Sequence, residues 1–221
     1  MSRAQAVEPQ PAKPDVFTRR AAIVGRVSDA VTCADMQGVV VQITGMPKDF
    51  AAWLESYRIP YGKTWPLLKR RPDRTETAPD GSYVLCDLPA GGYVLTAALP
   101  HNGGRYGEKS RNAVVPPAGH ASCDITLSPT TVEGTVKWSA LPIAPVLMAI
   151  VRVVGSGETT ETAADGSYRL VAIQPGKRCI SVTANGLEPA ELEVELATGK
   201  VVAQDFLLTP AIVMPANRKE R

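Results

Sequence analysis

The sequence predicts an all-β protein built from two tandem β-sandwiches, the first of which carries a short helical insertion. The composition is rich in turn-forming residues, with 18 Gly and 19 Pro in 221 residues and only 5% aromatics, which is typical of short strands separated by tight turns. The segment TETAPDGSY at 75–83 recurs as TETAADGSY at 160–168, an offset of 85 residues. A repeating unit of this length is a whole domain, so the chain contains two copies of one fold.

The offset between the copies changes along the chain. Residues 24–27 correspond to 133–136 at an offset of 109, so the first copy holds about 24 extra residues, which we place at 46–69, between its second and third strands. Thr130 is a very short linker, so we expect the two domains to adopt a limited range of angles. The expected organisation is an N-terminal tail at 1–20, a first sandwich at 21–129, a second sandwich at 130–210 and a C-terminal tail at 211–221.

Short apolar or alternating segments bounded by turn residues predict the strands. The Asp80-Gly81 dipeptide favours a tight reversal between antiparallel strands. About seven strands in each copy is typical of a β-sandwich. The strands expected in the first copy are 22–27, 39–44, 75–78, 82–88, 93–99 and 123–127, and those in the second are 132–138, 146–154, 159–163, 168–173, 179–184, 192–196 and 201–208.

The strand-and-turn pattern resembles the carboxypeptidase regulatory-like family. This resemblance implies that each copy is a seven-stranded transthyretin-like (prealbumin-like) sandwich, and the second copy departs from the pattern at Arg178, where an aromatic residue is expected. The family's motif residues build turns and core, so the resemblance implies a fold and no chemistry. In the first copy the pattern is carried by Gly25, Val27, Gly38, Val39, Val41, Thr77, Asp80, Gly81, Tyr83, Leu85, Leu88, Pro89, Gly91, Tyr93 and Leu95.

The insertion concentrates aromatic residues that the rest of the chain lacks. Their spacing predicts a helix from Pro47 to about Pro60, with one apolar face. We expect Phe50 and Trp53 to point inward and Tyr61, Trp65 and the basic run to point outward. Trp, Tyr and Arg dominate binding hot spots, so the segment is a candidate partner interface. The candidate residues are Phe50, Trp53, Tyr57, Tyr61, Trp65, Arg70 and Arg71.

Two other interpretations of the insertion stay open at this point. The helix could pack on its own sandwich and cover an edge strand, as sandwich edges require protection. The basic run at 69–71 could be a solvated loop instead of a surface for an acidic partner. The combination of such a repeat with an inserted D-F-A-A-W-L segment at 49–54, followed by Tyr61-Gly62 and Trp65, is also similar to small proteins that accompany bacterial contractile injection systems (phage-tail-like assemblies). This resemblance implies a protein partner within a larger assembly.

Composition and motifs argue against several other functions. The net charge of +2 with mixed signs argues against nucleic-acid binding. The sequence has no apolar stretch of signal-peptide or membrane-spanning length, so we expect a cytoplasmic protein with no membrane insertion and reduced cysteines. His101 and His120 lie in separate turn-like segments, and no nucleophile, metal or nucleotide motif occurs, so we expect neither enzymatic activity nor a metal or cofactor.

The sequence therefore favours a non-enzymatic structural or adaptor protein that mediates protein–protein interaction. A contractile-injection-system accessory is its most specific form, and self-association through sandwich edges is compatible with it. One alternative is a carbohydrate-binding or other ligand-binding module that uses Trp65 and Tyr61 as stacking platforms. A further alternative is a cryptic hydrolase assembled from scattered residues.

Overall fold

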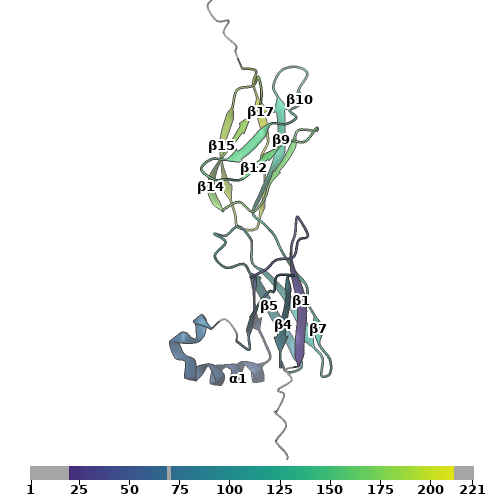
Figure 1. Ribbon diagram of the computed structural model, residues 1–221, viewed down its shortest axis with the longest axis vertical. Helices are drawn as coiled ribbons and strands as arrows, with labels where there is room; N and C mark the ends of the chain where they lie inside the picture. Colours follow the sequence, from purple (N-terminus) through teal and green to yellow (C-terminus); the bar gives the residue numbers. More distant parts are fainter. Residues whose placement is uncertain (1–19, 69–70, 212–221) are drawn as a thin grey trace, which may run out of the picture.

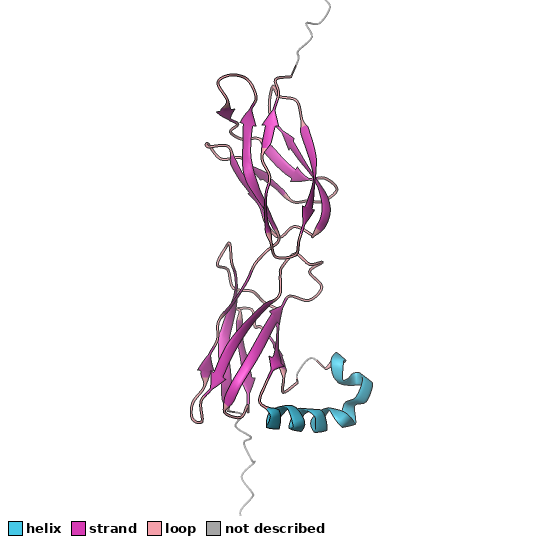
Figure 2. Ribbon diagram, turned by 180° about the vertical axis from the view of Figure 1, so that it is seen from behind, coloured by secondary structure: helices cyan, strands magenta, loops and turns pink. Residues whose placement is uncertain are grey.

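The computed structural model describes residues 20–68 and 71–211. It consists of two β-sandwiches stacked end to end into an elongated molecule, with one helical segment projecting from the first (Figure 1). Strands make up nearly all the regular structure outside that segment (Figure 2). The predicted fold class, two all-β sandwiches with a helical insertion in the first, is confirmed.

The first sandwich, domain 1, packs two four-stranded sheets against each other. One sheet has the order β4-β1-β7, with β8 also paired to β1, and the other has the order β3-β2-β5-β6. The core between them includes Ile23, Val41, Leu95 and Ile125, all fully buried or nearly so. The strands are β1 (Ala21–Asp29), β2 (Val40–Gly45), β3 (Arg74–Glu76), β4 (Ser82–Cys86), β5 (Gly91–Ala98), β6 (Lys109–Val115), β7 (Ala121–Ser122) and β8 (Ile125–Leu127).

The second sandwich, domain 2, repeats this plan without the insertion. One sheet has the order β10-β9-β13, with β16 and β17 also paired to β9, and the other has the order β12-β11-β14-β15. Val132, Val151, Ile180 and Leu208 lie in its core. The strands are β9 (Thr131–Trp138), β10 (Ala144–Pro145), β11 (Ile150–Val153), β12 (Thr159–Glu161), β13 (Ser167–Leu170), β14 (Gly176–Thr183), β15 (Ala190–Leu196), β16 (Val201–Ala203) and β17 (Phe206–Leu208).

The sequence does not predict β6 of domain 1. Strand β6 reads KSRNAVV and buries only Ala113 and Val115. It is an edge strand that pairs only with β5, so most of its side chains face solvent and no apolar alternation marks it. Its counterpart β15 reads AELEVEL, and its alternation does predict a strand.

The last strand of each sandwich is interrupted at the same point, which accounts for the short strands β7, β8, β16 and β17. In domain 1 the Tyr83 hydroxyl donates a hydrogen bond to the Cys123 carbonyl at this interruption. A Cβ on Gly25 would lie 2.0 Å from that carbonyl oxygen, so only glycine permits the approach. The corresponding residues of domain 2 are Gly134, Tyr168 and Gln204. The repeated Gly and Tyr of the sequence pattern therefore serve the fold.

The four cysteines are free thiols, of which Cys33 is exposed and Cys123 buried. Among the described residues, no helix combines the length and the apolar character that crossing a bilayer requires.

The two domains are joined through Thr130, which is fully buried. Its N–H donates to the Arg105 carbonyl at 2.7 Å, and its hydroxyl accepts the Gly199 N–H at 2.8 Å. Its own carbonyl accepts the Ile173 N–H at 3.0 Å. Since one linker residue is hydrogen-bonded to loops of both domains, the linker is itself part of the interface.

Direct contacts between the domains reinforce this joint. The Arg105 guanidinium of domain 1 forms an ion pair with Glu158 and donates to the Ala172 carbonyl, both in domain 2. The backbones of Gly107 and Gly199 approach so closely that a Cβ on Gly199 would lie 2.6 Å from the Gly107 Cα. These contacts restrict rotation of one domain against the other.

Acidification is expected to loosen this joint. Hydrogen bonds from Ser156 and Arg105 lower the pKa of Glu158 to about 2 from its ordinary 4.5. The depressed pKa means that the ion pair contributes fully above about pH 4.5 and is lost as the pH falls toward 2. The Glu158→Gln variant removes the charge at neutral pH, and small-angle X-ray scattering should then detect a broader range of domain orientations.

The matched control for this prediction is Glu195→Gln, which removes an equally charged but exposed side chain from β15. It should leave the scattering curve unchanged. If Glu158→Gln scatters at pH 7 as the unsubstituted protein does, the hydrogen bonds of Thr130 hold the joint without help from the ion pair.

Candidate protein-docking site

The insertion forms a hook, defined here as residues 46–68, at the end of domain 1 opposite to domain 2. It consists of α1 (Lys48–Arg58) followed by the 3-10 segment η1 (Ile59–Leu67). Figure 1 shows it leaving the base of the sandwich and turning back at a distance from the sheets. The predicted helix is present, and its aromatic side chains line one face as their spacing indicates.

Local sequence explains the shape of the hook. Pro47 precedes α1 with an extended backbone, and Asp49 lies in the first turn, where a negative charge favours the helix dipole. Glu55 and Arg58 form an ion pair at 2.9 Å in the last turn. Gly62, with φ of 49° and ψ of −124°, then breaks the helical path and redirects the chain.

A continuous row of aromatic contacts runs along the hook. Phe50 stacks on Trp53 with ring centroids 5.4 Å apart, and Trp53 stacks on Tyr57 at 5.1 Å. Tyr57 contacts Tyr61 at 5.8 Å, and Tyr61 contacts Trp65 at 5.7 Å. These separations suit offset or edge-on aromatic pairs, so the row stiffens a segment that has little other support.

Only the first residue of this row is anchored in the sandwich. Phe50 is 4% exposed and meets the Tyr93 ring edge-on at 5.9 Å. In domain 2, Arg178 stands in the place of Tyr93. Both side chains hydrogen-bond to the corresponding carbonyl, Pro89 in domain 1 and Gln174 in domain 2. Domain 2 has no hook, which explains why it does not need the aromatic ring at this position.

Trp53, Tyr57 and Tyr61 are exposed whereas Trp65 is half-buried, and two of these rings differ from the expected orientation. Trp53 was expected to point inward, yet 47% of it is exposed, because α1 leaves the sandwich after its first turn. Tyr57 and Tyr61 are 41% and 37% exposed. Trp65 was expected to point outward and is instead half-buried against its aromatic neighbours. The helix does not cover an edge strand, since Phe50 is its one buried residue.

The basic run differs from expectation at Arg71. The sequence predicts an outward-pointing guanidinium that faces either solvent or an acidic partner, but the Arg71 side chain is only 6% exposed and forms an ion pair with Asp73 at 3.2 Å. The guanidinium carbon also lies 5.1 Å from the centroid of the Trp65 ring, a cation–π contact. Arg71 therefore stabilises the C-terminal part of the hook through its contact with Trp65. Lys69 and Arg70 lie outside the described residues.

Two hollows flank the hook. The first, about 340 Å³, lies beside the exposed Trp53 and is lined by Asp49, Phe50, Trp53, Asp87 and Pro89. Both charged residues in it are carboxylates. The second, about 540 Å³, lies at the bend between α1 and η1, and it is lined by Glu55, Ser56, Arg58, Ile59, Gly62, Trp65 and Pro66. A concave surface with exposed aromatic rings at its rim is suited to receive an apolar protein segment.

The two histidines that the sequence offers as possible catalytic residues or metal ligands do not lie in a common site. His101 precedes β6 and His120 follows it, and both side chains are exposed. Across residues 20–68 and 71–211, no group of three or more His, Cys, Asp or Glu side chains is arranged to hold a metal ion.

Comparison with solved structures finds remote likenesses. The shaft pilin SpaA of Lactobacillus rhamnosus GG is 12% identical, over 90% of this chain and 100% of that one, with a TM-score of 0.40. The Bacillus anthracis TIE protein is 13% identical, over 87% of this chain and 34% of that one, with a TM-score of 0.38. A cohesin–X-dockerin complex of Acetivibrio cellulolyticus matches at 16% identity and a TM-score of 0.32, over 37% of this chain and 58% of the other.

Comparison with known sequences gives a match to part of the chain. No curated protein matches the chain. Domain 1 shares the hydrogen bonds of domain 2 at its repeated Gly and Tyr, although the family match lies in domain 2. Residues 131–209, which form domain 2, match the carboxypeptidase regulatory-like domain family.

Proposed function

We propose that the protein is a non-enzymatic adaptor that docks to a protein partner through its hook. The observation that carries this proposal is the row of Trp53, Tyr57 and Tyr61, each more than a third exposed on a segment that leaves the sandwich. Exposed aromatic rings beside a hollow are the usual composition of a binding hot spot. The joined domains then serve as a spacer behind the hook.

The more specific proposal is an accessory component of a phage-tail-like contractile injection system. It rests on the resemblance of the repeat, combined with the inserted aromatic segment, to such accessory proteins. We also propose that the protein acts in the cytoplasm, and the four free thiols, among them the exposed Cys33, support a reducing compartment.

The Trp53→Ala variant tests the docking role. Hot-spot truncations cost about 2 kcal/mol or more, which corresponds to a loss of about 30-fold in affinity. Affinity purification from the native organism, followed by mass spectrometry, should therefore recover a partner with the unsubstituted protein and not with this variant. Trp53 is half exposed, so the melting temperature of the variant should stay close to that of the unsubstituted protein.

The matched control is Leu192→Ala, which removes an equally exposed apolar side chain from β15, remote from the hook. It should recover the partner in full. Equal recovery with Trp53→Ala and Leu192→Ala would contradict the docking role.

The carbohydrate-binding alternative receives less support from the geometry. It requires open faces on Trp65 and Tyr61, whereas Trp65 is half-buried and in contact with Arg71, Tyr57 and Tyr61. Saturable binding of a glycan by calorimetry, abolished in Trp53→Ala, would favour that alternative over a protein partner.

A further inference from the structure

A second exposed apolar surface lies at the opposite end of the molecule from the hook. We call it the tip, residues 138–148, which connect β9 to β11 at the distal end of domain 2. The sequence has no ionisable side chain between Lys137 and Arg152. Leu141 is 90% exposed and Met148 65% exposed. The large exposed apolar residues of the tip are Trp138, Leu141, Ile143, Leu147 and Met148.

The exposed tip includes a residue, Met148, with an unfavourable backbone conformation. Met148 has a left-handed φ of +57°, which a residue with a Cβ adopts only at a conformational cost. Its N–H donates to the Thr162 carbonyl, as the Gly38 N–H does to Thr77 in domain 1. Gly38 has the same left-handed backbone with φ of +73°. Where domain 1 has the residue that suits this conformation, domain 2 has a large apolar one, and its side chain gains little burial within the monomer.

The internal repeat indicates how a second copy of the chain would contact the hook and the tip. Domain 2 contacts domain 1 through the β11–β12 turn region, where Glu158 pairs with Arg105. The hook occupies the corresponding connection in domain 1, between β2 and β3, and it lies at the end of domain 1 that is remote from domain 2 (Figure 1). A second copy placed below with the same polarity would therefore bring its own domain 2, tip first, against the hook.

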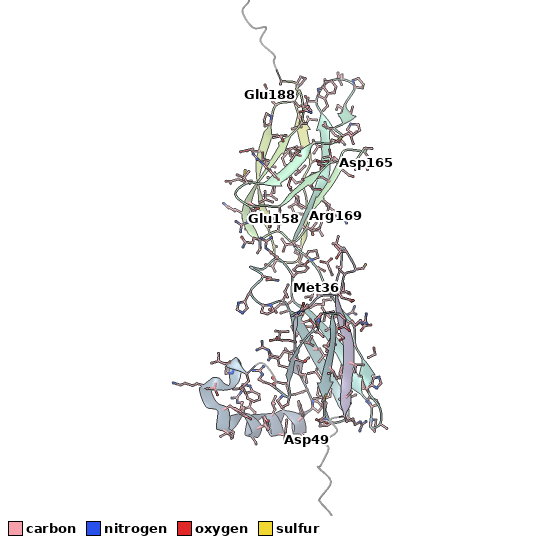
Figure 3. All side chains as sticks on the ribbon, viewed as in Figure 1. Met36, Asp49, Glu158, Asp165, Arg169 and Glu188 are labelled. Carbon is pink, nitrogen blue, oxygen red and sulfur yellow. The ribbon has the colours of Figure 1, made fainter. Side chains whose placement is uncertain are left out.

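The two surfaces also complement each other in shape and charge. The tip is a projecting loop, whereas the hook bounds a hollow of about 340 Å³ beside Trp53. The hollow is rimmed by Asp49 and Asp87, and the charged residue adjoining the tip on β9 is the exposed Lys137. Figure 3 shows Asp49 at the hook end of the molecule, remote from the distal end of domain 2. One chain cannot bring its own two surfaces together.

We propose that the tip of one copy docks into the hook of the next, so that the protein self-associates head to tail. This inference rests on the proposed function of the hook and names a second copy of this chain as its partner. Because the two contacting surfaces differ, the contact is heterologous, and it produces open chains unless rotation closes a ring.

Size-exclusion chromatography with multi-angle light scattering tests the proposal over micromolar to millimolar concentrations. The mass of the unsubstituted protein should rise with concentration. Trp53→Ala, in the hook, and Leu141→Asp, in the tip, should each weaken association at least about tenfold. Leu192→Asp, an equally apolar surface site on β15, is the matched control and should associate normally.

A mixture of the two defective variants gives the sharper test. Each keeps one intact surface, so together they should form a one-to-one dimer that does not grow further. A mixture that stays monomeric, when the unsubstituted protein associates, would overturn the head-to-tail arrangement, and so would normal association of Leu141→Asp. Met148→Gly should weaken association while raising the melting temperature, because glycine adopts the left-handed backbone without a Cβ.

Failure of this inference is distinguishable from failure of the proposed function. If the protein is monomeric at every concentration but Trp53→Ala loses a foreign partner, the hook docks another protein and the head-to-tail proposal is wrong. Binding of the unsubstituted protein, but not of Leu141→Asp, to phosphatidylcholine–phosphatidylglycerol vesicles in a flotation assay would assign the tip to a lipid surface and overturn the proposal as well.

Discussion

Replacing Gly25 with alanine is expected to destabilise domain 1 by about 3 kcal/mol or more, at the upper end of the range for overpacked interiors. The new Cβ would lie 2.0 Å from the Cys123 carbonyl oxygen and 3.0 Å from the Tyr83 ring. A backbone atom cannot move aside as a flexible side chain can. The substitution therefore forces β1 away from β7 and breaks the hydrogen bond from the Tyr83 hydroxyl. Chemical denaturation followed by circular dichroism measures the loss.

The control for this prediction is Gly92→Ala in β5 of the same domain. Gly92 has no heavy atom within 4 Å of its would-be Cβ, so the variant should lose far less stability. Equal stability of the Gly25→Ala and Gly92→Ala variants would show that the interruption between β7 and β8 adjusts to a side chain. The equivalent change in domain 2, Gly134→Ala, should behave as Gly25→Ala does, since its Cβ would lie 1.9 Å from the Gln204 carbonyl oxygen.

The repeated residues predict the fold well because they make the same backbone contacts in both domains. Thr77, for example, donates to the Met36 carbonyl at 2.6 Å and accepts the Val39 N–H at 2.9 Å. Thr162 forms the same pair of bonds in domain 2. Such local constraints require a particular residue type, so they leave a pattern that can be recognised in the sequence.

The arrangement of the candidate site is harder to predict from the sequence than the fold is. The i, i+3, i+4 spacing predicts which residues share a helical face, but it does not state whether that face meets the sandwich or solvent. For this reason the predicted inward orientation of Trp53 is wrong. The sequence predicts an exposed charge at Arg71, because the burial of its side chain depends on contacts with Asp73 and Trp65 that form only in the folded chain. The sequence does not identify the tip as a candidate surface, since the left-handed backbone at Met148 is not visible in it.

Replacing Phe50 with alanine is expected to detach the hook from domain 1. Phe50 is the one buried residue of α1, and it joins the Tyr93 ring of the core to the aromatic row. Truncation of a buried Phe costs about 3–5 kcal/mol, and we expect about 3 kcal/mol here because the side chain lies at the margin of the core. Hydrogen exchange should then show loss of protection at 48–58, while the strands of domain 1 keep theirs.

The comparison with Trp53→Ala decides what the hook is for. Phe50 and Trp53 are stacked neighbours on one helix, yet one is buried and the other half exposed. If the hook is a docking element, Trp53→Ala should cost less than about 1 kcal/mol of stability, as is usual for surface positions, and still abolish partner recovery. If instead Trp53→Ala destabilises domain 1 as much as Phe50→Ala, the aromatic row is an extension of the core. The clustering of aromatic residues in the insertion would then reflect stability alone, and the docking role would lose its main support.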